Sequence, residues 1–418
     1  MERVGLRLRG DKIIRRRGFS MSDRPNVVYV VHQYPVETQT FVESEWRALA
    51  ARGFRVDVFA LHGDKRMAIV HEDLRGPRRV PILLTYCKFI AKLLMNFRIV
   101  VSGYPGILDS YKSAGRFVYS VVRGVQLAIS VDRYSDVHLH AHFLGRTVEV
   151  AVIAKCLLGA RARLTATGHA GDVANPLSVS RLAKSVERCD AVVCASSFVG
   201  DKLVEQTGVF PRMIVHCGVK TRTSSGRPTR PDVLEILSVG RMVPKKGFDD
   251  CVLAAQVLLE EGAKFIWTFI GDGPMRVELA QQADKCGLRQ ELRFVGALGN
   301  DKVLETMARA DVFVLTPKQD ADGDIDGIPV VLMEAMEAGC VVIASRLSGI
   351  PELVEHRFNG LLVDPGSPAQ ISSAINLIRS ANIDLDHMSS KARHTIRQDF
   401  TAESGAERME ELILSLKG

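Results

Sequence analysis

Short apolar runs alternate with amphipathic stretches along most of the chain. The runs are rich in Val and Ile, which is typical of strands buried in a parallel sheet. The stretches between them place apolar residues every three or four positions, as helices with one buried face do. In the first half the pattern predicts strands at residues 26–31, 55–60, 137–142, 163–167, 191–195 and 212–216, helices at 40–52 and 147–158, and a loop at 168–172.

The second half repeats this alternation. It predicts strands at residues 234–240, 265–270, 292–295, 311–315 and 340–344. It predicts helices at 248–261, 303–309, 330–338 and 401–416, and a further helix that ends at 286. Strands that alternate with helices in both halves indicate an α/β fold of two doubly wound, Rossmann-like domains that face a central cleft. The predicted segments are a basic extension (1–24), a first domain (25–220), a linker (221–233), a second domain (234–400) and a C-terminal helix (401–418).

An acidic loop at residues 320–327 runs directly into the helix predicted at 330–338. Pro329 is expected at the first helical position, where proline is preferred. The first amides of a helix lack internal partners and carry partial positive charge, so the turn Gly327, Ile328, Pro329, Val330, Val331 is a candidate seat for a phosphate or diphosphate. Asp326 and Glu334 flank this seat, and Glu334 is placed to accept hydrogen bonds from ribose hydroxyls.

The acidic loop permits three other interpretations. Asp322, Asp324, Asp326 and Gly327 match a calcium loop, but Met333 stands where the last glutamate ligand belongs. The Asp-x-Asp pairs also match a metal-binding motif of sugar transferases, although any alternating acidic loop contains such pairs. A solvated surface loop is the third interpretation, and it suits Asp320, Asp322 and Asp324 best.

A second candidate phosphate contact follows the strand predicted at 234–240. Residues 240–247 form a basic turn in which Arg241 and Lys246 lie just beyond the strand end. Arg can bind a diphosphate through two hydrogen bonds and Lys as a point charge, so the pair could neutralise it without a metal. The spacing does not match a P-loop.

Histidines provide the remaining candidate chemistry. His169 lies on a strand-end loop, where it could hydrogen-bond a substrate hydroxyl or meet developing charge. His138, His140 and His142 alternate along one strand and therefore share a face. No carboxylate or cysteine near them in the sequence completes a metal-ligand set, so core and strand-end histidines are the favoured interpretation and no metal site is expected.

Composition narrows the class of protein. At 418 residues, 46% hydrophobic and 25% charged, the chain can bury two large cores. Its eight cysteines form no C-x-x-C pair, which indicates thiols of a reducing compartment. Residues 1–24 hold eight of the basic and three of the acidic residues. They are expected to form a basic arm, or to precede the native start at Met21, and they lack the apolar core of a secretory signal. A nucleic-acid partner is not expected.

The first domain contains a second basic zone between Arg75 and Arg123, with Asp109 as its single acid. Residues 81–101 inside it are apolar enough to suggest a membrane span. Lys88, Lys92 and Arg98 argue against one, because each would cost a few kcal/mol at the bilayer centre. A helix lying on an anionic membrane is one expectation, and an ordinary amphipathic helix packed on the domain core is the other.

Seven motifs together resemble the retaining glycosyltransferases of the GT-B fold, family 4, especially those of bacterial exopolysaccharide synthesis. The resemblance covers nearly all of residues 26–417. The motifs are residues 34–41, 140–143, Thr167-Gly-His-Ala-Gly-Asp172, Val239-Gly-Arg-Met-Val-Pro-Lys-Lys-Gly247, 270–274, Asp326-Gly-Ile-Pro-Val-Val-Leu-Met-Glu-Ala-Met336 and 348–353.

The resemblance implies transfer of an α-linked sugar from a nucleotide-sugar donor, with retention and without a metal or other cofactor. Arg241 and Lys246 would hold the diphosphate, Glu334 the ribose, and the backbone of 327–331 the sugar and phosphates. Asp326 and His169 would serve the donor sugar and the reacting centre. The helix at 401–416 would cross back onto the first domain.

Two positions depart from the family pattern. Asp326 stands where the family usually has glutamate, and Thr38-Gln39-Thr40 replaces the common Ser-Glu-Thr on the acceptor side, where His142 is also expected. The leading hypothesis is therefore a cytoplasmic transferase, peripheral on the inner membrane, that extends a saccharide or polyprenyl-linked acceptor. A nucleotide-sugar epimerase and a non-catalytic nucleotide-sugar-binding protein of an assembly complex are the alternatives.

Overall fold

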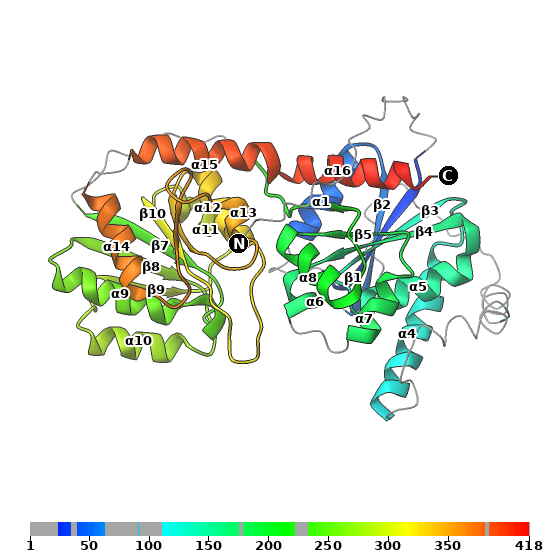
Figure 1. Ribbon diagram of the computed structural model, residues 1–418, viewed down its shortest axis with the longest axis horizontal. Coiled ribbons are helices and arrows are strands. Elements are labelled where there is room, and N and C mark those ends of the chain that lie inside the picture. The colour runs from blue at the N-terminus through cyan, green and yellow to red at the C-terminus, as the bar shows by residue number, and fades with distance from the viewer. Residues whose placement is uncertain are drawn as a thin grey trace.

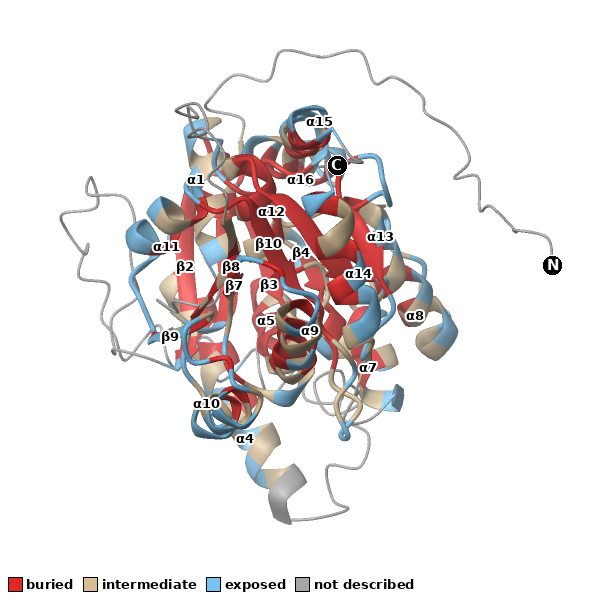
Figure 2. Ribbon diagram, turned by 90° about the vertical axis from the view of Figure 1, so that its left-hand side faces the viewer, coloured by how far each residue is buried: buried red, intermediate tan, exposed pale blue. Residues whose placement is uncertain are grey.

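The structure, a computed structural model, describes residues 24–34, 40–62, 91, 111–174, 179–221, 233–380 and 384–417. These residues form two lobes side by side, each built on a parallel sheet with helices against it (Figure 1). Buried residues are concentrated in the strands and in the helix faces turned toward them (Figure 2). The predicted fold class of two doubly wound, Rossmann-like domains is confirmed.

The first sheet has the strand order β2-β1-β3-β4-β5-β6. Residues of β1 alternate between two cores: Val28 and Val30 join one, whereas Val27, Tyr29 and Val31 join the other. Both faces of the sheet are thus covered, which is why its strands are apolar throughout. The elements are β1 (Asn26–Gln33), α1 (Thr40–Ala51), β2 (Arg55–His62), α4 (Tyr111–Ser130), β3 (Val137–His142), α5 (Arg146–Leu158), β4 (Ala162–Gly168), α6 (Ala170–Ala174), α7 (Val179–Val186), β5 (Ala191–Cys194), α8 (Ser197–Thr207) and β6 (Met213–Ile214).

The second sheet has the order β12-β11-β10-β7-β8-β9. Its strand order reverses between β7 and β10, and ligands of open α/β sheets bind at such a switch point, beyond the carboxyl ends of the strands. The elements are β7 (Leu234–Val239), α9 (Phe248–Glu260), β8 (Phe265–Ile270), α10 (Arg276–Lys285), β9 (Leu292–Gly296), α11 (Asn300–Met307), β10 (Val312–Leu315), α12 (Val330–Ala338), β11 (Val341–Ser345), α13 (Ile350–Leu353), β12 (Leu361–Val363), α14 (Pro368–Arg379), α15 (Leu385–Asp399) and α16 (Ala402–Ser415).

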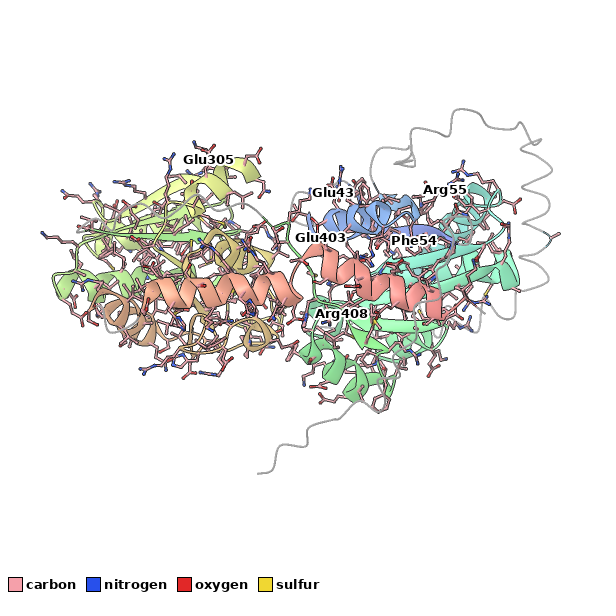
Figure 3. All side chains as sticks on the ribbon, turned by 90° about the horizontal axis from the view of Figure 1, so that it is seen from above. Glu43, Phe54, Arg55, Glu305, Glu403 and Arg408 are labelled. Atoms are coloured by element: carbon pink, nitrogen blue, oxygen red, sulfur yellow. The ribbon has the colours of Figure 1, made fainter. Side chains whose placement is uncertain are left out.

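The last two helices lie end to end across both lobes (Figure 3). Thr401 and Ser404 form a capping box that starts α16. Ala406 and Ile413 of α16 then pack into the core that holds Phe54 of the first domain. The chain also passes between the domains near Val219. The backbone N–H of Val219 donates to the carbonyl of Phe400, and its carbonyl accepts from the N–H of Ala402. The two crossing segments therefore run side by side.

Several local predictions differ from the structure. The loop expected at 168–172 is the end of β4 followed, after His169, by the short helix α6. The strand expected at 212–216 is reduced to Met213–Ile214, and the helix expected at 303–309 is Asn300–Met307. Pro329 is the N-cap of α12, not its first helical residue. The sequence pattern also missed α4, α7, α8, α13, β12, α14 and α15.

Some predictions fall outside the described residues. They are the basic extension, nearly all of the linker, most of the apolar basic segment 81–101, and Thr38 and Gln39. Within the part of the chain that the structure does describe, we find no helix with the length and apolar character needed to span a bilayer.

Candidate active site

The basic turn leaves β7 at the switch point of the second sheet. Pro244–Lys246 form one turn of 3-10 helix, which ends at Gly247 with φ 69°. A side chain at Gly247 would place its Cβ 2.2 Å from the carbonyl oxygen of Thr316, so glycine is required both by the backbone angle and by this close approach. The turn is thereby packed against Thr316, the residue directly after β10.

Two lysines of the turn are ion-paired with the acidic loop. Lys246 Nζ lies 2.7 Å from one oxygen of Asp326, and Lys245 Nζ lies 3.4 Å from the other. Lys245 is also 2.7 Å from Asp324. Burial alone would lower the pKa of Lys245, but Asp324 and Asp326 outweigh it and raise that pKa. The loop is therefore held over the turn by charge, with Arg241 exposed beside it.

The acidic loop leads into the start of α12. Pro329, the N-cap, offers no side-chain cap to the first amides of the helix, since a proline side chain has no acceptor. These amides are the ones expected to face a phosphate. Val330, Val331 and Glu334 are half-buried on the first turns of the helix, while Leu332 and Met333 point into the domain core. The start of α12 thus has no side-chain cap on its first amides, and the phosphate seat stays a prediction.

His138, His140, His142 and His169 form a histidine cluster in the first domain. His142 and His169 lie at the carboxyl ends of β3 and β4. His142 Nδ1 is 3.2 Å from Nε2 of His169, and their rings stack with centroids 5.4 Å apart. The backbone N–H of His169 donates to Asp172 at 2.9 Å. His142 is fully buried, and Phe41 also packs on both rings. The rings are thus held by packing as well as by hydrogen bonds.

Phe143, which follows His142, has φ 70°. A bulky side chain is rare in this left-handed region, and such strain is characteristic of functional sites. The Thr147 hydroxyl donates to the carbonyls of His142 at 2.8 Å and of Phe143 at 2.5 Å, which supports the turn. The Phe143 ring lies 4.5 Å from that of His169 and closes one side of it.

Burial keeps most of the cluster neutral at pH 7. It lowers the pKa of His138 to about 4, and together with His142 it lowers the pKa of His169 to about 3. Burial and its histidine neighbours hold the pKa of His140 well below the ordinary range. His169 is therefore a neutral group that can accept or donate a hydrogen bond, not a fixed cation.

The two candidate groups meet where the domains touch. Ile325 of the acidic loop packs into a core of the first domain. A Cβ on Gly327 would lie 3.3 Å from Ala170, the residue after His169. The predicted phosphate seat therefore lies against the start of α6. Among the predicted site residues, Lys246 contacts Asp326, and His142 contacts His169.

A second contact between the domains involves Glu352. Its carboxylate accepts hydrogen bonds from the backbone N–H groups of Ser197 and Phe198, at the start of α8, and lies 3.1 Å from His216 Nε2. Burial alone would raise the pKa of Glu352, but these hydrogen bonds outweigh it and lower that pKa. Glu352 thus caps a helix of the other domain.

One group in the described residues has the composition of a metal site. Glu45, His140 and His142 each offer a ligand atom, and these atoms lie within 4.8 Å of one another. No carboxylate near the histidines in the sequence was found, but folding brings Glu45 of α1 to them from a distant part of the chain. In the acidic loop, by contrast, Asp324 and Asp326 are paired with lysines and Asp320 accepts two backbone N–H groups.

Three residues of the site were missed from the sequence. Glu45 had a usable signal: it occupies the buried face of α1 with Val42, Trp46 and Leu49, where a charge requires a partner. Lys245 adjoins Lys246, and the sequence does not distinguish which of two neighbouring lysines turns inward. Glu352 lies in a recognised motif, but its partners belong to the other domain, which no local pattern reveals.

Comparison with known families agrees with this geometry. Residues 38–223 match the family described as Glycosyltransferase Family 4, and residues 220–395 match Glycosyl transferases group 1. The chain belongs to glycosyltransferase family 4. The histidine cluster of this family 4 chain lies within the first match, and its basic turn and acidic loop lie within the second.

Individual relatives of the family 4 chain match over part of its length. It is 32% identical over 210 residues to the amylovoran biosynthesis glycosyltransferase AmsK of Erwinia amylovora, covering 50% of each protein. It is 36% identical over 188 residues to the putative colanic acid biosynthesis glycosyltransferase WcaL of Escherichia coli K12, covering 44% of this chain and 46% of that protein. The chain thus spans about half the length of these curated relatives.

Solved structures support the fold of the family 4 chain. The crystal structure of Anabaena Alr3699/HepE in complex with UDP has a TM-score of 0.63 and 16% identity, and the match covers 94% of this chain and all of that one. The crystal structure of a glycosyltransferase from Rickettsia africae ESF-5 has a TM-score of 0.66 and 14% identity, and the match covers 94% of this chain and 99% of that one. Both share the two-domain GT-B architecture with this chain.

Proposed function

We propose that this protein transfers a sugar, with retention, from a nucleotide-sugar donor to a saccharide acceptor in bacterial surface or exopolysaccharide synthesis. The observation that carries the proposal is the Lys246–Asp326 pair at the switch point of the second sheet, which lies against the histidine-bearing edge of the first domain. Relatives named for amylovoran and colanic acid biosynthesis support the polysaccharide class.

The donor diphosphate is assigned to the basic turn and the start of α12. Arg241 and Lys246 neutralise it, and the backbone from Gly327 to Val331 binds its oxygens and the sugar. Glu334, one turn further along the helix, accepts hydrogen bonds from the ribose. No metal ion is required in this assignment. The UDP in the Alr3699/HepE structure supports a nucleotide ligand for this fold.

The proposed reaction breaks the bond between the anomeric carbon and the diphosphate oxygen. The acceptor oxygen forms its new bond on the same face of the sugar, and its proton passes to the leaving phosphate oxygen, so no side chain acts as nucleophile. Asp326 orients the sugar hydroxyls, and the neutral His169 stabilises the developing positive charge. A fixed, dry environment of this kind supplies catalysis through orientation and electrostatics.

The acceptor is proposed to be lipid-linked, at the inner face of the cytoplasmic membrane, with the protein cytoplasmic or peripheral on that surface. The first domain forms the acceptor side, through Thr38, Gln39 and residues near His142. Since His142 is itself buried behind His169, its contribution is to support the site from within.

The first test is a thermal-shift panel of UDP-, GDP- and ADP-sugars with and without chelator, because a ligand that binds only the folded state raises the melting temperature. One nucleotide class should stabilise the protein in chelator. Arg241→Ala should remove the shift, whereas Arg289→Ala, an exposed arginine of the same domain, should keep it.

Failure of every nucleotide, or binding only with a divalent ion, would contradict the donor site and direct attention to the acidic loop. Binding without turnover on any saccharide would favour a non-catalytic binding protein. Formation of an epimer without an acceptor would favour an epimerase.

A further inference from the structure

A buried carboxylate extends the histidine cluster away from the proposed donor site. Glu45 lies on α1, 9% exposed, between the sheet and the helix. Moving a carboxylate out of water is costly unless charged or hydrogen-bonding partners compensate. Among the described residues, Glu45 has no ion pair with Lys or Arg, so its partners must be the polar groups of the cluster.

Those partners are a tyrosine and the histidines of β3. The Tyr29 hydroxyl donates to Glu45 Oε1 at 2.8 Å. The same oxygen lies 3.4 Å from His142 Nε2 and 3.8 Å from His140 Nε2. Burial alone would raise the pKa of Glu45, but His142 and the hydrogen bonds outweigh it and lower that pKa. Glu45 is therefore an anion inside the domain.

His142 connects this anion to His169. Its Nε2 is buried and forms no regular hydrogen bond among the described residues, and the Glu45 carboxylate lies 3.4 Å from it. Its Nδ1 lies 3.2 Å from Nε2 of His169. The three side chains form a continuous row from the interior of the first domain to the residue assigned to the reacting sugar.

We propose that Glu45 is a positioning residue that fixes the tautomer of His169 through His142. A carboxylate can only accept, so a neutral His142 must carry its proton on Nε2. His142 Nδ1 is then an acceptor, and His169 must donate to it from Nε2–H. The remaining nitrogen of His169, Nδ1, keeps its lone pair, which suits a group that meets developing positive charge.

A metal ion held by Glu45, His140 and His142 fits the contacts less well. His140 Nδ1 lies 2.8 Å from the Thr165 hydroxyl, and His140 Nε2 lies 3.0 Å from that of Thr167. Both nitrogens of His140 are therefore already engaged, and a metal would have to displace Thr167. The row from Glu45 to His169 requires no such displacement.

The tautomers can be observed directly by nitrogen-15 NMR of selectively labelled histidine at pH 8, in the full chain, with His169 assigned through His169→Asn. In the unmodified protein Nε2 of His169 should carry the proton and Nδ1 should not. In Glu45→Gln the amide can donate to His142 Nε2. That would move the His142 proton to Nδ1 and reverse the tautomer of His169.

Two further variants separate this effect from general disturbance. Tyr29→Phe removes the other hydrogen bond of Glu45 but leaves its charge, so His169 should keep its tautomer. Glu149→Gln changes another buried carboxylate of the same domain, which binds Arg116 at 3.0 Å, and should also leave His169 unchanged. Glutamine can also still accept from His142, so Glu45→Leu, which has no acceptor, is compared with it. An unchanged His169 in both Glu45→Gln and Glu45→Leu would overturn the proposal, as would displacement of the His140 and His142 signals by a bound ion that EDTA removes.

The catalytic consequence rests on the proposed function and is measured separately. Glu45→Gln should lower kcat about 10- to 100-fold with little change in the donor KM, because the donor contacts lie in the other domain. If the unmodified protein transfers no sugar, the proposed function fails while the NMR result still decides the tautomer. If it transfers sugar and Glu45→Gln retains both kcat and tautomer, only the inference about Glu45 fails.

Discussion

The two walls of the candidate site use opposite electrostatics. The first-domain wall is a row of buried histidines beside the carboxylate of Glu45, which has no Lys or Arg partner among the described residues. The second-domain wall consists of half-buried lysines paired with acidic side chains close to solvent. A diphosphate carries charge that cations must match, whereas a reacting sugar needs neutral, fixed groups. In the proposed function the second domain therefore binds the diphosphate and orients the sugar through Asp326, and the first domain supplies the neutral His169 beside the reacting centre.

The walls also differ in how they can respond to a ligand. Lys246 is already paired with Asp326 at 2.7 Å, so a diphosphate would compete with Asp326 for this lysine. Asp326 would then be released toward the sugar hydroxyls. The histidine row needs no rearrangement, since its contacts lie within a packed core. Substitutions in the loop should therefore alter binding and turnover, whereas substitutions in the row should alter turnover and acid stability.

The largest effect is expected at Asp326. Asp326→Ala should lower transfer by about 1,000-fold, because a group that orients the sugar in the transition state is lost. Asp326→Glu should keep transfer within about tenfold, since the carboxylate remains. The comparison is steady-state transfer, with Asp322→Ala as an exposed substitution in the same loop. Unchanged turnover in Asp326→Ala would remove this residue from the site.

A smaller effect on binding is expected at Lys246. Lys246→Ala should raise the Kd for the donor by about 100-fold, because the diphosphate loses a charge-assisted contact. Isothermal titration with the nucleotide that stabilises the protein measures the change. Lys302→Ala, on an exposed lysine of α11, should bind as the unmodified protein does. Equal affinity in both variants would show that Lys246 serves only to hold the loop.

The histidine wall should make the first domain sensitive to acid. The pKa of His138, about 4, and that of His169, about 3, lie below their ordinary value of 6.5. Each histidine therefore binds a proton on unfolding, and its contribution to stability is complete above pH 6.5 and lost as the pH falls toward the folded value. Each contributes a slope of about 1.4 kcal/mol per pH unit.

Urea unfolding between pH 8 and 5 measures this slope. Asp172 acts in the opposite direction between its ordinary pKa and about 6, because burial raises its pKa, so the difference between variants is the informative quantity. His138→Gln should reduce the slope by about 1.4 kcal/mol per pH unit, the contribution of one proton. His394→Gln, on the exposed side of α15, should leave the slope unchanged. Identical slopes would mean that His138 is charged in the folded protein.

The sequence pattern predicted the described strands except β12, for a physical reason. Buried parallel strands are apolar on both faces, so they stand out as runs of Val and Ile. The helix α15 was missed because it buries only a narrow stripe, in which Leu385, Met388, Ala392 and Ile396 are separated by polar residues. So narrow a stripe gives too weak a hydrophobic periodicity for the helix to be recognised from the sequence.

The same reasoning explains which site residues were found. Lys246 and Asp326 lie on the segments that follow the neighbouring strands β7 and β10, and these segments leave the sheet at its switch point, so the topology brings them together. Glu45 and Glu352 act on groups brought to them by tertiary folding. Their partners are absent from the surrounding sequence, so both were missed, although the carboxylate on the buried face of α1 was a usable signal for Glu45.

The smallest effect is expected where the two walls are joined, at Glu352. Glu352→Gln keeps the shape of the side chain but removes the charge that the N–H groups of Ser197 and Phe198 share, at a cost of about 1 kcal/mol. Amide hydrogen exchange at these two residues should then rise about fivefold, since the contact opens more often. Glu355→Gln, exposed three residues later, should leave both rates unchanged.

Because the pKa of Glu352 is lowered, the unmodified contact should persist at pH values below the ordinary 4.5 of glutamate and fail only as the pH falls through the folded value. Exchange that, relative to the intrinsic rate at each pH, already rises at pH 5 would contradict the lowered pKa of Glu352.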